Sequence, residues 1–192
     1  MQKLLITALL FMLGLWVWNE FFRAIPHLQE KGVLKNFQVE PLKRISATYL
    51  VHDHRFVKPE RRVLHQASPV VGHFNDLAYL SNIDALLLTQ ALPAMQATLT
   101  FDEAKRCYQL EGPISTADRN FFNMHVQHFS LIAATEKIAN QIRRLKSGQK
   151  ITLTGDLVTV HSGTTGQEFQ VGTGSEYRNQ CQLLRVTHLQ QH

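Results

Sequence analysis

The ten histidines of this chain are the residues best suited to chemistry, because imidazole binds metals and transfers protons near neutral pH. In a strand, alternation of side chains would place His52 and His54 on one face and Asp53 on the other. Two imidazoles on one face could hold zinc or copper if another strand supplied a third ligand. The alternative, which we favour, is an exposed polar strand end.

A second candidate is the segment His73-Phe74-Asn75-Asp76, which we expect in a loop between a strand and a helix. Loops carried by a rigid scaffold often hold catalytic or binding residues. His73 could act as a general base, with Asp76 orienting its ring. Alternatively, Asn75 and Asp76 satisfy loop amides, as turn residues do, and this structural role is the one that we favour.

The polar loop Gly172–Arg178 is a third candidate. Its glycines would let backbone amides face a ligand, and Tyr177 and Arg178 could clamp an anion or a ring. An ordinary long hairpin turn is the alternative, and it is favoured here.

Charge and composition describe a mildly basic chain, with 20 Lys plus Arg against 15 Asp plus Glu. Its cations form small clusters, and Arg143 and Arg144, followed by Lys146 and Lys150, make one of them. This cluster could bind an anionic lipid or polymer, although a solvated surface is the favoured interpretation. A nucleic-acid binder would gather more cations on one face, so nucleic acid is not an expected partner.

The two cysteines, Cys107 and Cys181, both fall in predicted strands. In an oxidising compartment they could pair and close a long loop. They could equally be two buried thiols that act as small apolar residues.

Familiar catalytic motifs are missing from the sequence, which has no GxSxG, no P-loop, no GxGxxG and no CxxC. We therefore expect no cofactor and lean against an enzyme. A small hydrolase or metalloenzyme that uses His73 and Asp76 remains the alternative.

The first 22 residues bear on the location of the protein in the cell. An apolar run from Leu4 to Trp18 follows Lys3 and would reach about 22 Å as a helix, with Phe21 and Phe22 extending it. A cleaved signal peptide fits less well, because Leu13-Gly14-Leu15 and Arg23-Ala24-Ile25 match a small-x-small cleavage site poorly. A soluble hydrophobic helix is the third alternative. We predict a transmembrane signal anchor that contacts the bilayer through residues 4–22.

The rest of the chain predicts an α+β domain. Short apolar, β-branched runs indicate seven or eight strands, including a hairpin around Asp102-Glu103 and a strand over Lys150–Val160 with a bulge near Gly155. Two helices are expected, one opened by a capping box at Ser81–Asp84 and one ending near Gly148. The predicted fold is a transmembrane anchor helix with a juxtamembrane extension over 1–31, then a single soluble α+β domain over 32–192. That domain is expected to have a bent antiparallel sheet or small barrel and two packed helices.

Two resemblances support this interpretation. The segment Lys146–Val158 resembles the opening strand of OB-like barrels, with a basic glycine turn before alternating apolar residues. Several segments also resemble a group of uncharacterised, amino-terminally anchored bacterial proteins: His73–Asp76, Leu80–Asp84, Arg106–Gln109, Asn123–His125 and the unit Ile138–Val160 with Cys181. The resemblance implies anchoring and a single domain, and it implies no activity.

From these observations we expect a non-enzymatic binding or accessory module at the bacterial inner membrane. The short tail ahead of the apolar run favours a cytoplasmic amino terminus and a periplasmic body, with a protein of a membrane or envelope complex as partner. A cytoplasm-facing, OB-like nucleic-acid binder is a further alternative, which the lack of aromatic residues in Ile151–Val160 disfavours.

Overall fold

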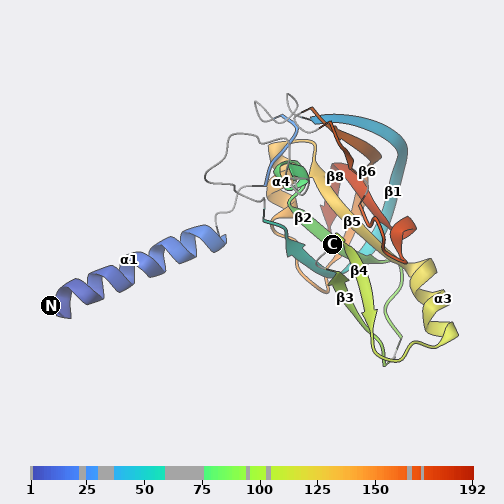
Figure 1. Ribbon diagram of the computed structural model, residues 1–192, viewed down its shortest axis with the longest axis horizontal. Coiled ribbons are helices and arrows are strands. Elements are labelled where there is room, and N and C mark those ends of the chain that lie inside the picture. Colours follow the sequence, from blue (N-terminus) through green and yellow to red (C-terminus); the bar gives the residue numbers. More distant parts are fainter. Residues whose placement is uncertain are drawn as a thin grey trace.

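The computed structural model describes residues 2–21, 25–29, 37–58, 76–93, 96–102, 105–163, 166–169 and 171–192 (Figure 1). Its helices are α1 (Gln2–Phe21), α3 (Thr116–His125) and α4 (Glu136–Ile142), with short 3-10 helices η1 (Asp76–Tyr79) and η2 (Arg178–Gln180). The strands are β1 (Phe37–Phe56), β2 (Ile83–Leu88), β3 (Thr98–Asp102), β4 (Cys107–Glu111), β5 (Val126–Ala133), β6 (Lys150–Ser162), β7 (Glu168–Phe169) and β8 (Cys181–Gln191).

Five strands close into a ring in the order β1-β2-β5-β8-β6, because β6 pairs back with β1. The long β1 makes the closure possible: its first part pairs with β6 as far as Leu50, and its last part, from Leu50 to Phe56, pairs with β2. In the ring β5 and β8 run parallel, and the other neighbours run antiparallel. Counted along the chain, the third ring strand (β5) and the fifth (β8) are parallel, and α4 lies between the third (β5) and the fourth (β6). This is the connectivity of OB-type barrels.

Strand alternation sorts the apolar side chains into two cores. One core fills the ring, with residues such as Val51, Leu87, Leu131 and Leu153 that are completely buried, and α4 closes its end with Ile142. The other core lies outside the ring, on β2, β5 and β8, where β3, β4 and α3 pack over it. Burial of two apolar layers is the main stabilising contribution in a domain of this size.

The hairpin of β3 and β4 is a separate two-stranded sheet on the outer face of the ring. A disulfide between Cys107 of β4 and Cys181 of β8 joins it to the ring, with the two Cα atoms 5.4 Å apart. The hairpin is where the sequence predicted it, around Asp102, and that prediction is confirmed.

The predicted fold needs two corrections in the body. The sheet is mixed rather than antiparallel, because β8 lies beside β5 in the same direction. The prediction of a helix after Ser81 is wrong, since Ile83–Leu88 is the fully buried strand β2. A short, continuous apolar run suits a strand covered on both faces as well as a helix, and here the flanking layers select the strand.

Other predictions are confirmed. The helix near Gly148 is α4, and the hydroxyl of Thr135 caps it by accepting the amide of Ile138. The strand from Lys150 is β6, with a register shift between Thr154 and Gly155 at the predicted bulge. Along the chain, this segment is the fourth of the five ring strands, whereas the resemblance assigned it as an opening strand.

The amino-terminal helix requires a further correction. Among the described helices, none combines the length and the apolar character needed to cross a lipid bilayer, so the predicted transmembrane helix is wrong. The physical reason is length: the apolar run Leu4–Trp18 reaches about 22 Å, short of a hydrocarbon core of ~30 Å.

The segment after α1 docks on the ring. His27 forms a parallel bridge to Ala133, at the end of β5, and the amide of Leu28 donates to the carbonyl of Ala133 at 3.0 Å. Ile25 and Leu28 are buried. The chain therefore enters the body at the end of the ring that α4 closes.

Candidate functional site

The most unusual group in the described body is Asp84, a carboxylate with no exposed surface in the middle of the apolar outer core. Strand alternation explains its position. Ile83, Ala85 and Leu87 point into the ring, so Asp84 points outward, onto the face that the β3–β4 hairpin covers. A carboxylate cannot be buried there without partners that replace its hydration.

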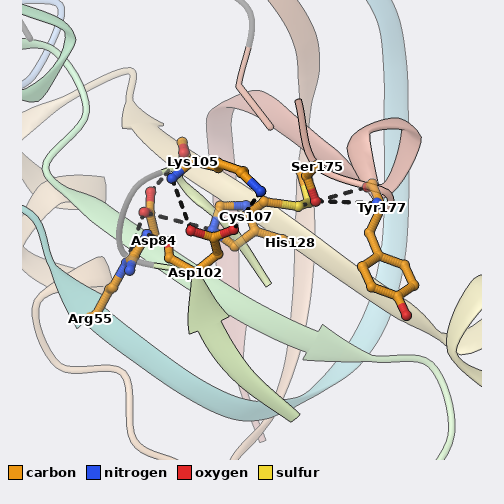
Figure 2. The surroundings of a disulfide bond; sticks show 10 residues. Arg55, Asp84, Asp102, Lys105, Cys107, His128, Ser175 and Tyr177 are labelled. Carbon is orange, nitrogen blue, oxygen red and sulfur yellow. Dashed lines mark hydrogen bonds and ion pairs between the residues drawn. A yellow bond between two sulfur atoms is a disulfide. The ribbon is translucent and has the colours of Figure 1, made fainter. Parts of the chain in front are cut away.

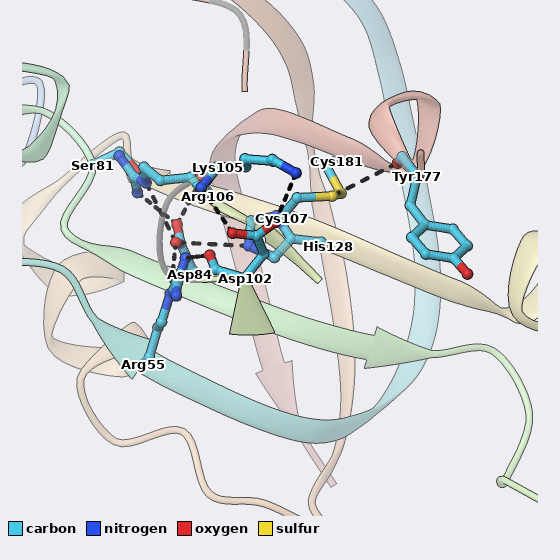
Figure 3. A network of polar contacts seen from close by, with 11 residues as sticks. Arg55, Ser81, Asp84, Asp102, Lys105, Arg106, Cys107, His128, Tyr177 and Cys181 are labelled. Carbon is cyan, nitrogen blue, oxygen red and sulfur yellow. Dashed lines mark hydrogen bonds and ion pairs between the residues drawn. A yellow bond between two sulfur atoms is a disulfide. The ribbon is translucent and has the colours of Figure 1, made fainter. Parts of the chain in front are cut away.

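Those partners come from the β3–β4 hairpin, from β5 and from β1 (Figure 3). Arg106, just before β4, donates from Nη2 at 2.5 Å and from Nε at 3.3 Å, which makes a two-pronged contact with the carboxylate. Ser130 of β5 donates its hydroxyl at 2.6 Å, and Nε of Arg55, on β1, donates at 3.2 Å. Nε2 of His128 lies 3.6 Å from Oδ2, beyond hydrogen-bond distance.

The electrostatics of this cluster favour an ionised carboxylate. Burial alone would raise the pKa of Asp84, but the charge of Arg106 and the contacts with Arg106 and His128 outweigh it and hold that pKa well below its usual range. Two guanidinium groups face this carboxylate, so removing it would leave buried positive charge without compensation.

The cluster also positions the hairpin. Arg55 donates from Nη2 to the carbonyl of Asp102 at 2.9 Å, and its guanidinium lies 4.7 Å from the centre of the Phe101 ring. Arg106 has a positive φ of 47°, a conformation of tight turns. Figure 2 shows the disulfide of Cys107 beside these residues, so the covalent and ionic links act on the same part of the hairpin.

This arrangement does not resemble a catalytic general acid or base. Asp84, His128 and Ser130 have no exposed surface, and the hydroxyl of Ser130 donates to Asp84, not to the imidazole. A nucleophile needs a neighbouring base and access for its substrate. The geometry instead supports a structural role, in which the cluster fixes the hairpin to the ring.

The histidines of the proposed metal site lie on β1. A register shift between Val51 and Asp53 places His52 at an irregularity in the β1–β2 pairing. Asp53 accepts the backbone amide of His54 at 2.7 Å. Across the described residues, no group of three or more metal-binding side chains is brought together.

The other predicted site residues fall partly outside the described part of the chain. His73 lies outside the described residues, as does the side chain of Asp76, at the start of η1. Tyr177 is buried and stacks on the ring of Tyr108 at a centroid distance of 4.5 Å, so it belongs to the outer core, whereas Arg178 is exposed.

Arg143 and Arg144 are exposed at the carboxyl end of α4, where Arg143 is the capping residue. They lie in the connection that leads to β6, beside the predicted lysines Lys146 and Lys150, which are also exposed. This cluster is the one predicted ligand site whose members stay together on the surface of the described body.

The Asp84 cluster was missed because Ser81–Asp84 was interpreted as a capping box. One signal could have revealed it: Asp84 is the single charged residue within the run Ile83–Leu88, and a buried charge requires a partner. Nothing in the sequence identifies Arg106 as that partner.

The fold and this site define an α+β protein with a ring of five strands and a hairpin fixed to its outer face by a disulfide and a buried ion pair. Comparison with known proteins gives no family: no family model matches the chain, and neither a curated protein nor a solved structure matches it significantly.

Proposed function

We propose that this protein is a non-enzymatic binding or accessory module that α1 attaches to a lipid bilayer, with its body on the extracytoplasmic side. A protein of a membrane or envelope complex is the proposed partner of the body. The observation that carries the proposal is the surface of α1. Nine large apolar side chains between Leu4 and Leu15 are 51–77 % exposed.

These side chains surround α1 instead of forming one stripe, because they occupy nine of twelve consecutive positions. A helix that is apolar on all sides needs apolar surroundings on all sides. The acyl region of a bilayer supplies them, and at roughly 25 cal/mol per Å² of apolar surface the gain for several leucines is large. Attachment to lipid therefore accounts for a surface that water would disfavour.

The body weighs against the two alternative functions. Its outer face over β2 and β5, where OB-type barrels take oligonucleotides, is covered by the hairpin, and Leu86, Leu88 and Val126 there are almost completely buried. This disfavours the nucleic-acid alternative. The acid–base groups of the Asp84 cluster are likewise sealed, which weakens the case for an enzyme within the described residues.

The disulfide between Cys107 and Cys181 supports the extracytoplasmic location. Disulfides persist in oxidising compartments and are rare where thioredoxin and glutathione keep thiols reduced. A body that depends on this link would therefore fold on the oxidising side of the membrane.

Vesicle flotation tests the attachment. The full chain should rise with phosphatidylcholine vesicles in a density gradient, and Leu9→Lys should leave most of the protein at the bottom, because a charge in the acyl region costs about 3 kcal/mol. The matched control is Leu42→Lys on β1, since Leu42 is 69 % exposed and Leu9 is 72 % exposed.

The Leu42→Lys chain should float like the unsubstituted protein. The proposal fails if the full chain does not float, or if Leu9→Lys floats as well as Leu42→Lys. Co-purification of the full chain with one protein whose release depends on Leu9 would instead assign α1 to a protein groove.

A further inference from the structure

One end of the body is strongly positive. The connection from α4 to β6 exposes four cations within eight residues: Arg143, Arg144, Lys146 and Lys150. Within the described residues, none of them forms an ion pair. The position of Arg143 and Arg144 at the carboxyl end of α4 is favourable for the helix dipole, but that contact leaves their charge exposed.

The acidic residues near this end do not balance it. On α4, Glu136 is exposed beside Lys137, and on β1, Asp53 approaches the hydroxyl of Ser147 at 3.5 Å. Among the residues that the structure describes here, and counting Lys137, five exposed cations face two carboxylates, a side-chain excess of three positive charges. This excess accounts for much of the net charge of +5 of the whole chain.

The same end receives the chain from α1. Leu28 is bonded to Ala133, two residues before the capping residue Thr135 of α4. Four residue steps separate Phe21, the last residue of α1, from the buried Ile25, a span of at most roughly 14 Å. Figure 1 shows α1 leaving the body on the side of α4, with α3 at the opposite end.

We propose that the cations Arg143, Arg144, Lys146 and Lys150 rest on the anionic headgroups of the membrane to which α1 is attached, and so fix the orientation of the barrel on it. This inference rests on the proposed function. Each basic residue held near an anionic surface strengthens binding roughly five-fold, and the attraction fades within a Debye length of ~8 Å. The short connection to α1 lets this surface approach the headgroups to within that range, whereas α3 lies at the opposite end of the body.

The orientation can be measured directly. A fluorophore on Ser147→Cys would report the α4 end, and one on Met124→Cys, on α3, would report the far end, since Met124 is 65 % exposed. The vesicles carry a headgroup quencher and about 30 % phosphatidylglycerol, enough to create the surface potential. Quenching should be at least about five-fold stronger at position 147, and about 1 M salt, with a Debye length of ~3 Å, should reduce the difference.

Charge removal provides the second test. The double variant Arg143→Gln/Arg144→Gln should lose about twenty-five-fold in affinity for these anionic vesicles and nothing for phosphatidylcholine vesicles, since two five-fold factors are removed. The matched control is Lys43→Gln/Arg44→Gln, two exposed cations in the middle of β1, which should change neither affinity.

The outcomes separate the two proposals. If the full chain binds neither kind of vesicle, the proposed attachment fails. If it binds both equally, if both fluorophores are quenched alike, or if the control variant loses as much affinity as the α4 variant, attachment stands and the orienting role of the cations is overturned. Equal binding of the α4 variant and the unsubstituted chain to anionic vesicles also overturns it.

Discussion

At the scale of single residues, Asp84 connects the most parts of the molecule. Its carboxylate accepts hydrogen bonds from Arg106, Ser130 and Arg55, and these residues belong to the hairpin, to β5 and to β1. A buried ion pair contributes little net stability when intact, but removing one partner is costly because the other charge stays buried. The cluster therefore selects one placement of the hairpin.

We predict that Asp84→Asn lowers the free energy of unfolding by about 3–5 kcal/mol at neutral pH, measured by urea titration. Because the pKa of Asp84 is well below its usual range, its ionised form stabilises the fold above the ordinary aspartate pKa of ~4. That contribution is lost as the pH falls from ~4 toward the lower pKa of the folded state, so the difference from the unsubstituted chain should shrink there.

The control is Glu168→Gln, an exposed carboxylate on β7, which should change stability by less than about 0.5 kcal/mol. If Asp84→Asn does not fold, Ser130→Ala removes one donor and should cost about 1 kcal/mol. A stability difference for Asp84→Asn that stayed constant down to the lowest pH would contradict an ionised Asp84.

Gly155 occupies a second sensitive position. A Cβ there would overlap the backbone carbonyl oxygen of Arg185 on the adjacent strand. Gly155→Ala should therefore force β6 and β8 apart and cost about 1–3 kcal/mol in thermal or urea unfolding. Gly14→Ala is the control, because nothing lies within 4 Å of that position, and it should leave the unfolding of the barrel unchanged.

At the scale of elements, the sequence predicted best where the pattern is local. The α4 helix, β6 with its bulge, and the hairpin follow from spacing and turn residues close together in the chain. The helix α3 was missed although Ser115 and Asp118 form a capping box, because Phe122 is the sole buried residue of that helix and no apolar stripe marks it. For β2, full burial on both faces removed the alternation that identifies a strand.

The hairpin is the element that depends most on the disulfide. Its two strands pair with each other and not with the ring, so side-chain contacts and the Cys107–Cys181 link hold it. The cysteines are 74 residues apart, and closing a loop of that length stabilises by roughly 4 kcal/mol.

We predict that Cys107→Ala/Cys181→Ala loses most of this stabilisation in urea unfolding. Amide hydrogen exchange should accelerate most in β3 and β4, while β5 and β8 keep their protection. Reducing the unsubstituted protein should reproduce the same pattern. Uniform acceleration across the ring would show that the link supports the whole body instead of the hairpin.

At the scale of the whole molecule, ring closure could not be predicted. The contacts that close it are distant in sequence, as between the hydroxyls of Ser46 and Thr154, which lie 2.8 Å apart across 108 residues. Periodicity identifies strands but not the strands with which they pair. The sequence therefore could not distinguish a bent antiparallel sheet from a barrel. For the same reason, Arg106 could not be assigned to Asp84. The surface cluster at Arg143 and Arg144 was predictable because its members are neighbours in the chain.

The location of the body can be tested in intact cells through its thiols. Both cysteines of the chain are in the disulfide. Protein from acid-quenched cells should therefore not react with a maleimide-linked polymer before reduction. After reduction, each chain should carry two copies of the polymer. Cys107→Ala provides the control, because it leaves Cys181 as a free thiol that should take one addition without reduction. Since reducing compartments keep thiols free, two additions to the unreduced native protein would place the body in such a compartment and contradict the extracytoplasmic location.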